Sequence, residues 1–244
     1  MRRITLTIIS ACLLMASLMR AQSWLPERSG GVYYAYPVES SQNVHIPDGF
    51  DVFYISHYGR HGSRWLPDQH RYDWVMAQFD DDKNLTKAGR RLKKTLRKIV
   101  KDADGNAGQL TPLGASQHRG IARRMVEQFP RVFAGADTRI SARSSTVARC
   151  RASMLAFCDE LQKLCPALRV TPETDARHMS YLNHESAELK DLSARIRRQA
   201  DIVPDRFIAQ FFKDPGKVQQ PLQLLSELHT IASDMQDVPL DVSL

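Results

Sequence analysis

Apolar and polar positions alternate along this chain with two different periods. Residues 51–56 and 138–142 are short stretches of β-branched, aromatic and small side chains, which is typical of buried strands. Residues 84–103, 111–130 and 144–163 instead place apolar side chains every three to four positions, which predicts amphipathic helices. Strands that alternate with helices in this way favour an α/β fold with a parallel sheet.

Local signals predict where some of these elements end. Thr111 followed by Pro112 is a favourable helix start, because the hydroxyl caps the first turn and proline tolerates the first helical position. Asp104-Gly105-Asn106 ends the helix over 84–103. Residues 65–83 predict a loop with one short helix. Beyond residue 166 the pattern is mostly helical, and no strand is predicted after residue 172.

The N-terminal residues have the pattern of a secretory signal peptide. Arg2 and Arg3 precede a largely apolar run from Ile4 to Met19, and Ala21 offers a small residue for cleavage. The run is shorter than the ~20 apolar residues of a membrane-spanning helix. We therefore expect an exported protein, periplasmic or secreted, with no stable membrane insertion after cleavage.

Basic residues are concentrated in one helix. The formal charge of +7 falls to +4 when residues 1–21 are removed, because that segment holds three arginines and no acidic residue. The predicted helix over 84–103 carries eight basic residues on its polar face. This face is either solvated or a surface that steers polyanions. Aromatic residues are not interleaved with it and no nucleic-acid-binding module is recognised, so no nucleic-acid partner is expected.

Three cysteines remain after signal cleavage. Cys150 and Cys158 would lie ~12 Å apart along a helix, which is too far for a bridge. We expect buried apolar cysteines. A bridge between Cys158 and Cys165 stays open only if the helix ends between them. Nothing in their spacing indicates a thiol nucleophile or a metal site.

The strongest chemical indication directly follows the first predicted strand, in residues 60–64, Arg-His-Gly-Ser-Arg. Two guanidinium groups flank one imidazole, and Gly62 lets the backbone pass tightly beside it. Guanidinium forks match the oxygens of a phosphoryl group. The stretch therefore predicts a phosphate clamp at the carboxyl end of a strand, where ligands bind in open α/β sheets.

A second polar segment, residues 142–149, follows the other predicted strand. It places Arg149 in the first turns of the third helix, close to a helix N-terminus that favours anions. Three arginines and one histidine at one spot would be costly without an anionic ligand, and a phosphate dianion would satisfy them. We therefore expect Arg60, Arg64 and Arg149 to converge on His61.

His61 is the expected nucleophile. Its neutral Nε2 would attack phosphorus in line, while a backbone carbonyl would hold Nδ1–H. The arginines would neutralise charge on the equatorial oxygens as the transition state forms. This scheme needs no metal and no cofactor.

These motifs resemble those of the histidine phosphatase superfamily, in its acid phosphatase and phytase branch. Residues 60–64 match the family's R-H-G-x-R signature, residues 110–118 match L-T-x-L-G-x-x-Q-H, and residues 143–149 match R-S-[ST]-x-x-x-R. Within the branch the chain is most similar to bacterial multiple inositol polyphosphate phosphatases. The resemblance covers roughly residues 50–185.

The resemblance implies a fold and a division of the chain. The implied fold class is α/β, a phosphoglycerate-mutase-like open and mostly parallel sheet flanked by helices, with a mainly helical insertion. We expect a signal peptide over 1–21, an α/β core with the phosphate site over 22–172, and a mainly helical insertion or partial subdomain over 173–244.

The resemblance also implies an activity. The family's members are phosphoric monoester hydrolases that form a phosphohistidine and pass the phosphoryl group to water, and the substrates expected here are small phosphorylated molecules such as inositol polyphosphates. The implied nucleophile is His61. The implied phosphate ligands are Arg60, Arg64 and Arg149. His57 and Arg143 would contact and position these residues without touching the phosphate.

One part of the family pattern is missing. The family places its proton donor in a late H-D or H-A-E motif, and neither string occurs in this chain. The chain resembles the family domain without its C-terminal third, so we expect it to lack the donor and at least one core strand. A missing general acid would slow leaving-group protonation by about 10²–10⁴-fold.

Two alternative functions stay open. One is a catalytically impaired remnant that binds phosphate. The other is a phosphomutase of the same superfamily, against which the export signal argues.

Overall fold

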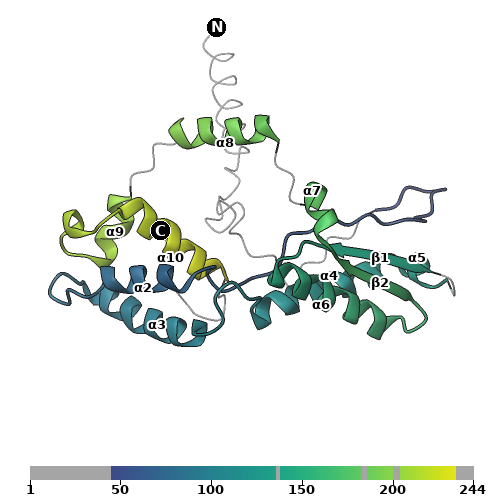
Figure 1. Cartoon of the computed structure of the whole chain (residues 1–244), viewed down its shortest axis with the longest axis horizontal. Coiled ribbons are helices and arrows are strands. Elements are labelled where there is room, and N and C mark those ends of the chain that lie inside the picture. Colours follow the sequence, from purple (N-terminus) through teal and green to yellow (C-terminus); the bar gives the residue numbers. More distant parts are fainter. Residues whose placement is uncertain (1–44, 136–137, 183–185, 200–203, 235–244) are drawn as a thin grey trace, which may run out of the picture. The chain divides into compact units, whose positions relative to one another are not determined.

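The computed structural model describes residues 45–135, 138–182, 186–199 and 204–234 (Figure 1). The predicted signal peptide over residues 1–21 lies outside them, as does the segment that follows it up to residue 44. None of the described helices combines the length and the apolar content that a membrane crossing requires.

Helices dominate the described chain. In chain order the elements are α2 (Gln69–Gln78), α3 (Lys87–Ala103), α4 (Pro112–Gln128), α5 (Pro130–Phe133), β1 (Arg139–Ser144), α6 (Ala148–Leu164), β2 (Arg169–Thr174), the 3-10 helix η2 (Ala176–His178), α7 (Met179–Leu182), α8 (Ala187–Gln199), α9 (Asp205–Phe211), the 3-10 helix η3 (Pro215–Lys217) and α10 (Pro221–Asp234).

The strands and α6 form a β-α-β unit. β1 and β2 pair in parallel, with Arg139 opposite Arg169 and Ser144 opposite Thr174. The connecting helix α6 packs against both strands, and α4 packs along α6 (Figure 1). A parallel pair joined through a packed helix is the defining unit of α/β folds, so the predicted fold class is confirmed. One hydrophobic cluster fills this unit, and its buried members are Ala122, Phe133, Leu161 and Leu168.

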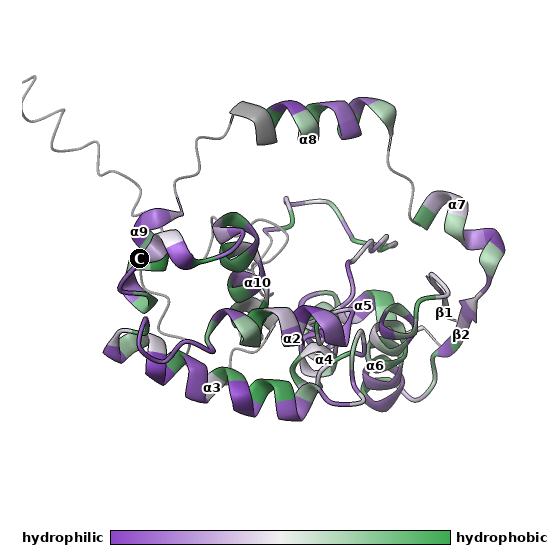
Figure 2. Ribbon diagram, turned by 60° about the vertical axis from the view of Figure 1, so that its left-hand side comes forward, coloured by the Kyte–Doolittle hydropathy of each residue, from purple (hydrophilic) through white to green (hydrophobic). Residues whose placement is uncertain are grey.

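A second hydrophobic cluster joins α2 and α3 to α9 and α10. It takes side chains from residues 66–103 and from residues 207–231. In Figure 2 the polar residues of α3 are purple and its apolar residues are green. Leu96 and Ile99 are among the apolar residues of α3 that the cluster buries. Gly89 allows α3 to approach α9 closely, because a Cβ there would overlap the backbone oxygen of Phe211. The predicted division at residue 172 stays a prediction, and this cluster draws side chains from both sides of it.

Side-chain caps set the helix starts. Thr111 accepts a hydrogen bond from the backbone N–H of Gly114 at 3.0 Å, and Pro112 takes the first helical position, as predicted. Thr86 caps α3 in the same way, through the N–H of Gly89 at 3.0 Å, so this helix starts at Lys87, three residues later than predicted. The short helix expected within 65–83 is α2.

Two strand assignments from the sequence were wrong. Residues 51–56 form no strand, and Phe53 and Tyr54 are 92% and 71% exposed. Within the described residues β1 pairs with β2 alone, so residues 51–56 have no strand partner, although Ile55 packs on the same cluster as Ile140 of β1. β2 was missed because Pro172 lies in it, and an edge strand tolerates a proline that a central strand would not.

The cysteines of α6 and its C-terminal cap are unbridged. Cys150, Cys158 and Cys165 are all free thiols, and Cys158 is buried. Burial, with the nearby carboxylate of Asp159, raises the pKa of Cys158 to about 11. This thiol therefore stays protonated and packs as a small apolar side chain, as predicted.

Candidate active site

The loop with the Arg-His-Gly-Ser-Arg stretch is fastened to α4. The Ser63 backbone N–H donates to Oε1 of Gln117 at 2.8 Å, and Gln117 Nε2 donates to the Ser63 hydroxyl at 3.0 Å. The Ser63 carbonyl accepts from both the N–H and the hydroxyl of Thr111, at 2.9 and 3.0 Å. Ser63 and Gln117 are buried. Buried polar groups whose hydrogen bonds are satisfied in this way hold a loop in one conformation.

Glycine permits this close attachment. A Cβ on Gly62 would overlap the backbone oxygen of Gly114, and its other nearest neighbours would be the Gly114 Cα and carbonyl carbon at 2.7 and 2.8 Å. A Cβ on Gly114 would in turn overlap the backbone of Ser63. The two backbones therefore meet where neither residue can carry a side chain. His61 lies directly before this contact and is positioned by it.

Ser153 links the same loop to α6. Its hydroxyl accepts from the Gly62 N–H at 3.1 Å and donates to the Arg149 carbonyl at 2.9 Å. One hydroxyl therefore joins the residue after His61 to the turn of α6 that carries Arg149. The two segments that sequence analysis predicted to converge are held together at this point.

The imidazole of His61 is close enough to three arginines for their charges to act on it. Burial is the main reason that the pKa of His61 falls to about 4. A hydrogen bond with the Gly62 backbone opposes this fall, while the positive charges of Arg60, Arg149 and Arg64 add to it. The structure thus brings all four predicted residues together. His61 Nδ1 lies 2.8 Å from the Gly62 carbonyl, which favours a proton on Nδ1 and leaves Nε2 with a lone pair.

Buried donors at this site lack a protein acceptor. Arg149 Nε is buried, and no hydrogen-bond partner for it lies among the described residues; the same holds for the hydroxyl of Ser145. α6 begins at Ala148, and no side chain caps its first turn. An unsatisfied buried donor is costly, and an anion at a helix N-terminus satisfies such groups. The arrangement therefore fits a phosphate group in front of His61.

Arg143 of β1 contacts its neighbour across the sheet, Glu173 of β2. Its Nε lies 3.2 Å from Oε2 of Glu173, and that same oxygen lies 3.4 Å from His178 Nε2. The hydroxyl of Tyr181 lies 2.7 Å from His178 Nδ1. Arg143 is thus held by a carboxylate, whereas Arg149 Nε has no such partner among the residues that the structure describes. This difference fits the predicted supporting role of Arg143.

The short helix α7 contacts both segments that carry the site. The hydroxyl of Tyr58, three residues before His61, donates to the Leu182 carbonyl at 2.7 Å. The backbone N–H and the hydroxyl of Thr146 lie 3.4 and 3.6 Å from the sulfur of Met179. α7 therefore supports the loop before His61 and the loop before Arg149.

Two further histidines lie beside Arg60. The ring of His57 stacks on that of Phe157, with centroids 5.5 Å apart and planes 9° from parallel, and burial against it lowers the His57 pKa. Burial and the nearby His57 lower the pKa of His118, which a hydrogen bond with the Arg60 backbone partly opposes. Both imidazoles are therefore neutral near neutral pH, which makes them poor general acids.

Sequence reasoning did not assign roles to Gln117, His118 and Ser153. The available signal was helical spacing, since Thr111, Gly114 and His118 lie three to four residues apart and recur on one face of α4. Thr111, Gly114 and His118 each contact the site loop.

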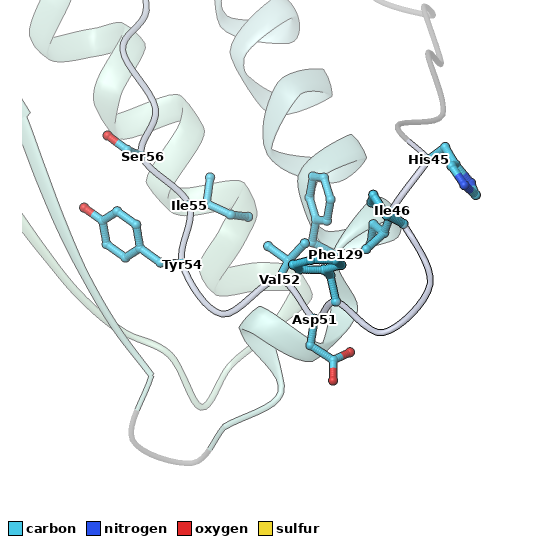
Figure 3. A pocket seen from close by; sticks show the side chains of 10 residues that line it. His45, Ile46, Asp51, Val52, Tyr54, Ile55, Ser56 and Phe129 are labelled. Carbon is cyan, nitrogen blue, oxygen red and sulfur yellow. The ribbon is translucent and has the colours of Figure 1, made fainter.

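An open hollow of about 510 Å³ lies elsewhere along the chain. It is lined by residues 45–47, 50–52, 54–56 and Phe129, whose side chains are drawn in Figure 3. Apolar groups make up most of its wall, and none of the residues predicted for the phosphate site lines it. The hollow therefore has no part in the chemistry of His61.

The low pKa of His61 predicts a specific titration. In the phosphate-free protein its ring protons, followed by NMR, should titrate near pH 4, because burial and the arginines disfavour the imidazolium. Phosphate should raise this midpoint, because a dianion offsets the arginine charges. A phosphate-free midpoint at or above 6.5 would contradict the geometry.

The same shift has a consequence for stability. In the unfolded chain His61 binds a proton below its ordinary pKa of 6.5, whereas in the folded protein it does so only below a pKa of about 4. The unfolded state therefore binds more protons in this window, and stability falls as the pH is lowered from 6.5 to about 4.

The fold has counterparts among solved structures. No protein-family model matches the chain, and neither does any curated protein. A crystal structure of Bifidobacterium longum multiple inositol polyphosphate phosphatase in complex with inositol hexasulfate is similar over 83% of this chain, with a TM-score of 0.55 and 18% identity. The phosphate complex of that protein is similar over 80%, with a TM-score of 0.50 and 18% identity. The chain spans 61% and 58% of the lengths of these two structures. The resemblance seen in the sequence is therefore confirmed at the level of the fold, which this chain shares with multiple inositol polyphosphate phosphatase.

Proposed function

We propose that this chain is the phosphate-binding part of an exported phosphomonoesterase that works through a phosphohistidine. The proposal rests on the half-buried imidazole of His61, on which the positive charges of Arg60, Arg64 and Arg149 act together. Three cations around a neutral nucleophile suit a phosphate dianion and no common neutral ligand.

The proposed reaction has two steps. Nε2 of His61 attacks phosphorus, so that an N–P bond forms and the P–O bond to the leaving group breaks. The leaving oxygen takes a proton. Water then attacks phosphorus, the N–P bond breaks, and the water gives up a proton to leave inorganic phosphate. The arginines offset the charge of the equatorial oxygens in both steps.

The substrates that we propose are small phosphorylated molecules, including inositol polyphosphates. The solved structures that share the fold are of an inositol polyphosphate phosphatase, one bound to inositol hexasulfate and one to phosphate. Arg60, one of the three arginines assigned to the site, is exposed and gives the site a basic rim toward solvent. A substrate with several phosphate groups would engage such a rim better than a single ester would.

The first step needs a proton for the leaving oxygen. The two imidazoles beside Arg60 are poor donors, because burial lowers the pKa of both His57 and His118. This observation favours a second candidate function, in which the chain binds phosphate groups and hydrolyses phosphate esters only slowly. The two candidates share the binding site and differ in the rate of the first step.

The leaving group distinguishes the two candidates. Phosphate release should be measured from 2,4-dinitrophenyl phosphate, whose leaving group needs no proton, and from inositol hexakisphosphate, whose leaving group does. Comparable kcat values would show that a general acid is present. A kcat about 10²–10⁴-fold lower for the inositol ester would match the slow candidate. If neither ester is cleaved faster than by a His61→Ala control, the proposed function is wrong for this chain.

A further inference from the structure

One side of α3 carries a continuous stripe of basic side chains. Its exposed members, which we call the α3 stripe, are Lys87, Arg90, Arg91, Lys94, Arg97, Lys98 and Lys101. At 100° and 1.5 Å per residue they fall within an arc of about 120° and span about 21 Å. The first acidic residue of the helix is Asp102, beyond the end of the stripe. Lys93 lies off the stripe and is buried in an ion pair with Asp82 at 2.9 Å.

The stripe is electrostatically unfavourable by itself. Its members repel one another at spacings of three and four residues, which destabilises a helix. Lys87 and Arg90 also lie at the start of the helix, where the dipole disfavours cations, and the first turn holds no acidic residue. Among the described residues, no carboxylate lies within ion-pair distance of a stripe member. Asp82, which pairs with Lys93, attracts Arg90 and Arg97 from further away and so offsets only part of the repulsion.

The rest of the helix limits what could bind there. The apolar face of α3 is buried in the cluster with α2 and α9, so it is not available to enter a bilayer. The stripe contains no aromatic side chain on which bases could stack. The stripe therefore offers a ligand only charge, arranged along one side of the helix.

We propose that the α3 stripe binds an extended, flexible polyanion, a chain of phosphate or sulfate groups. Such a ligand can follow the line of cations over its full length and offset their mutual repulsion. The binding site is separate from His61, so this proposal does not depend on the proposed catalysis.

Long-chain inorganic polyphosphate is a suitable probe. Its affinity, measured by fluorescence anisotropy, should fall steeply with salt. The triple variant Arg91→Gln, Lys94→Gln, Lys98→Gln should weaken binding at least about tenfold and reduce the slope of log Kd against log salt by about 2. Glutamine keeps a good helix propensity and removes repulsion, so the melting temperature should stay equal or rise.

A matched triple variant controls for net charge. Lys163, Arg206 and Lys217 are exposed and lie outside α3, and their replacement by glutamine should leave the affinity unchanged. Arg149→Gln is measured as well, because Arg149 belongs to the phosphate site and its replacement reports polyphosphate bound there. Equal losses in the two triple variants would overturn the proposal, and so would a loss confined to Arg149→Gln. Tighter binding to duplex DNA or to anionic lipid vesicles than to polyphosphate would overturn the choice of ligand.

Discussion

Gly62→Ala is expected to lower the free energy of unfolding by about 3 kcal/mol or more and to abolish phosphate release. The new methyl group would overlap the backbone of Gly114, which cannot move aside as a side chain can. Overpacking against side chains costs about 1–3 kcal/mol, and a backbone obstacle costs more. The displaced loop would also lose its hydrogen bonds to Ser153 and Gln117. Urea unfolding measures the first effect and phosphate release the second.

Gly216→Ala is the matched control for this substitution. A Cβ at that position would meet only Oδ1 of Asp214, at 3.3 Å, and the backbone dihedral is not in the left-handed region. We expect its free energy of unfolding to differ from that of the unaltered chain by no more than about 0.5 kcal/mol. If Gly62→Ala behaves like this control, the close contact of the two backbones is not a feature of the protein.

Arg149→Gln is expected to lower kcat by about 10²–10³-fold, the usual effect of removing one group that stabilises transition-state charge. The side chain lies at the start of α6, and its Nε is buried without a partner among the described residues. Glutamine keeps the length and removes the charge. The kcat of Arg149→Lys should lie between those of the unaltered chain and of Arg149→Gln. An ammonium keeps the charge but lacks the guanidinium fork that matches two phosphate oxygens. Steady-state kinetics with 2,4-dinitrophenyl phosphate measures these differences.

Arg151→Gln provides the comparison on the same helix. Arg151 lies two residues further along α6 and is exposed. Its replacement removes the same charge without touching the site, so we expect no more than a twofold change in kcat. Equal effects of the two substitutions would mean that Arg149 acts through net charge and not as a phosphate ligand.

Helices with strong periodicity could be predicted from the sequence. The apolar rows and the caps predicted α3, α4 and α6 to within a few residues, because these signals lie within each segment. Strands depend on a partner elsewhere in the chain. Residues 51–56 have strand-like composition and no strand partner among the described residues, whereas β2 contains Pro172 and pairs with β1.

The candidate site could be predicted only in part for the same reason. Arg60, His61, Arg64 and Arg149 follow from two local motifs, since their residue types and spacing already suit a phosphate. Gln117 and Ser153 act by binding the backbone N–H groups of Ser63 and Gly62, which are 54 and 91 residues away in the sequence. No local pattern reports a hydrogen bond to a distant backbone.

The most direct test of the proposed chemistry is to trap the phosphoryl group on the enzyme. The chain would be mixed with 2,4-dinitrophenyl phosphate, quenched under alkaline denaturing conditions that preserve phosphohistidine, and digested for mass spectrometry. We expect one phosphoryl group on His61, lost on acid treatment and absent from the His61→Ala variant. Phosphate release with no phosphoryl group on His61, or with the group on His57 or His118, would contradict the proposed role of His61.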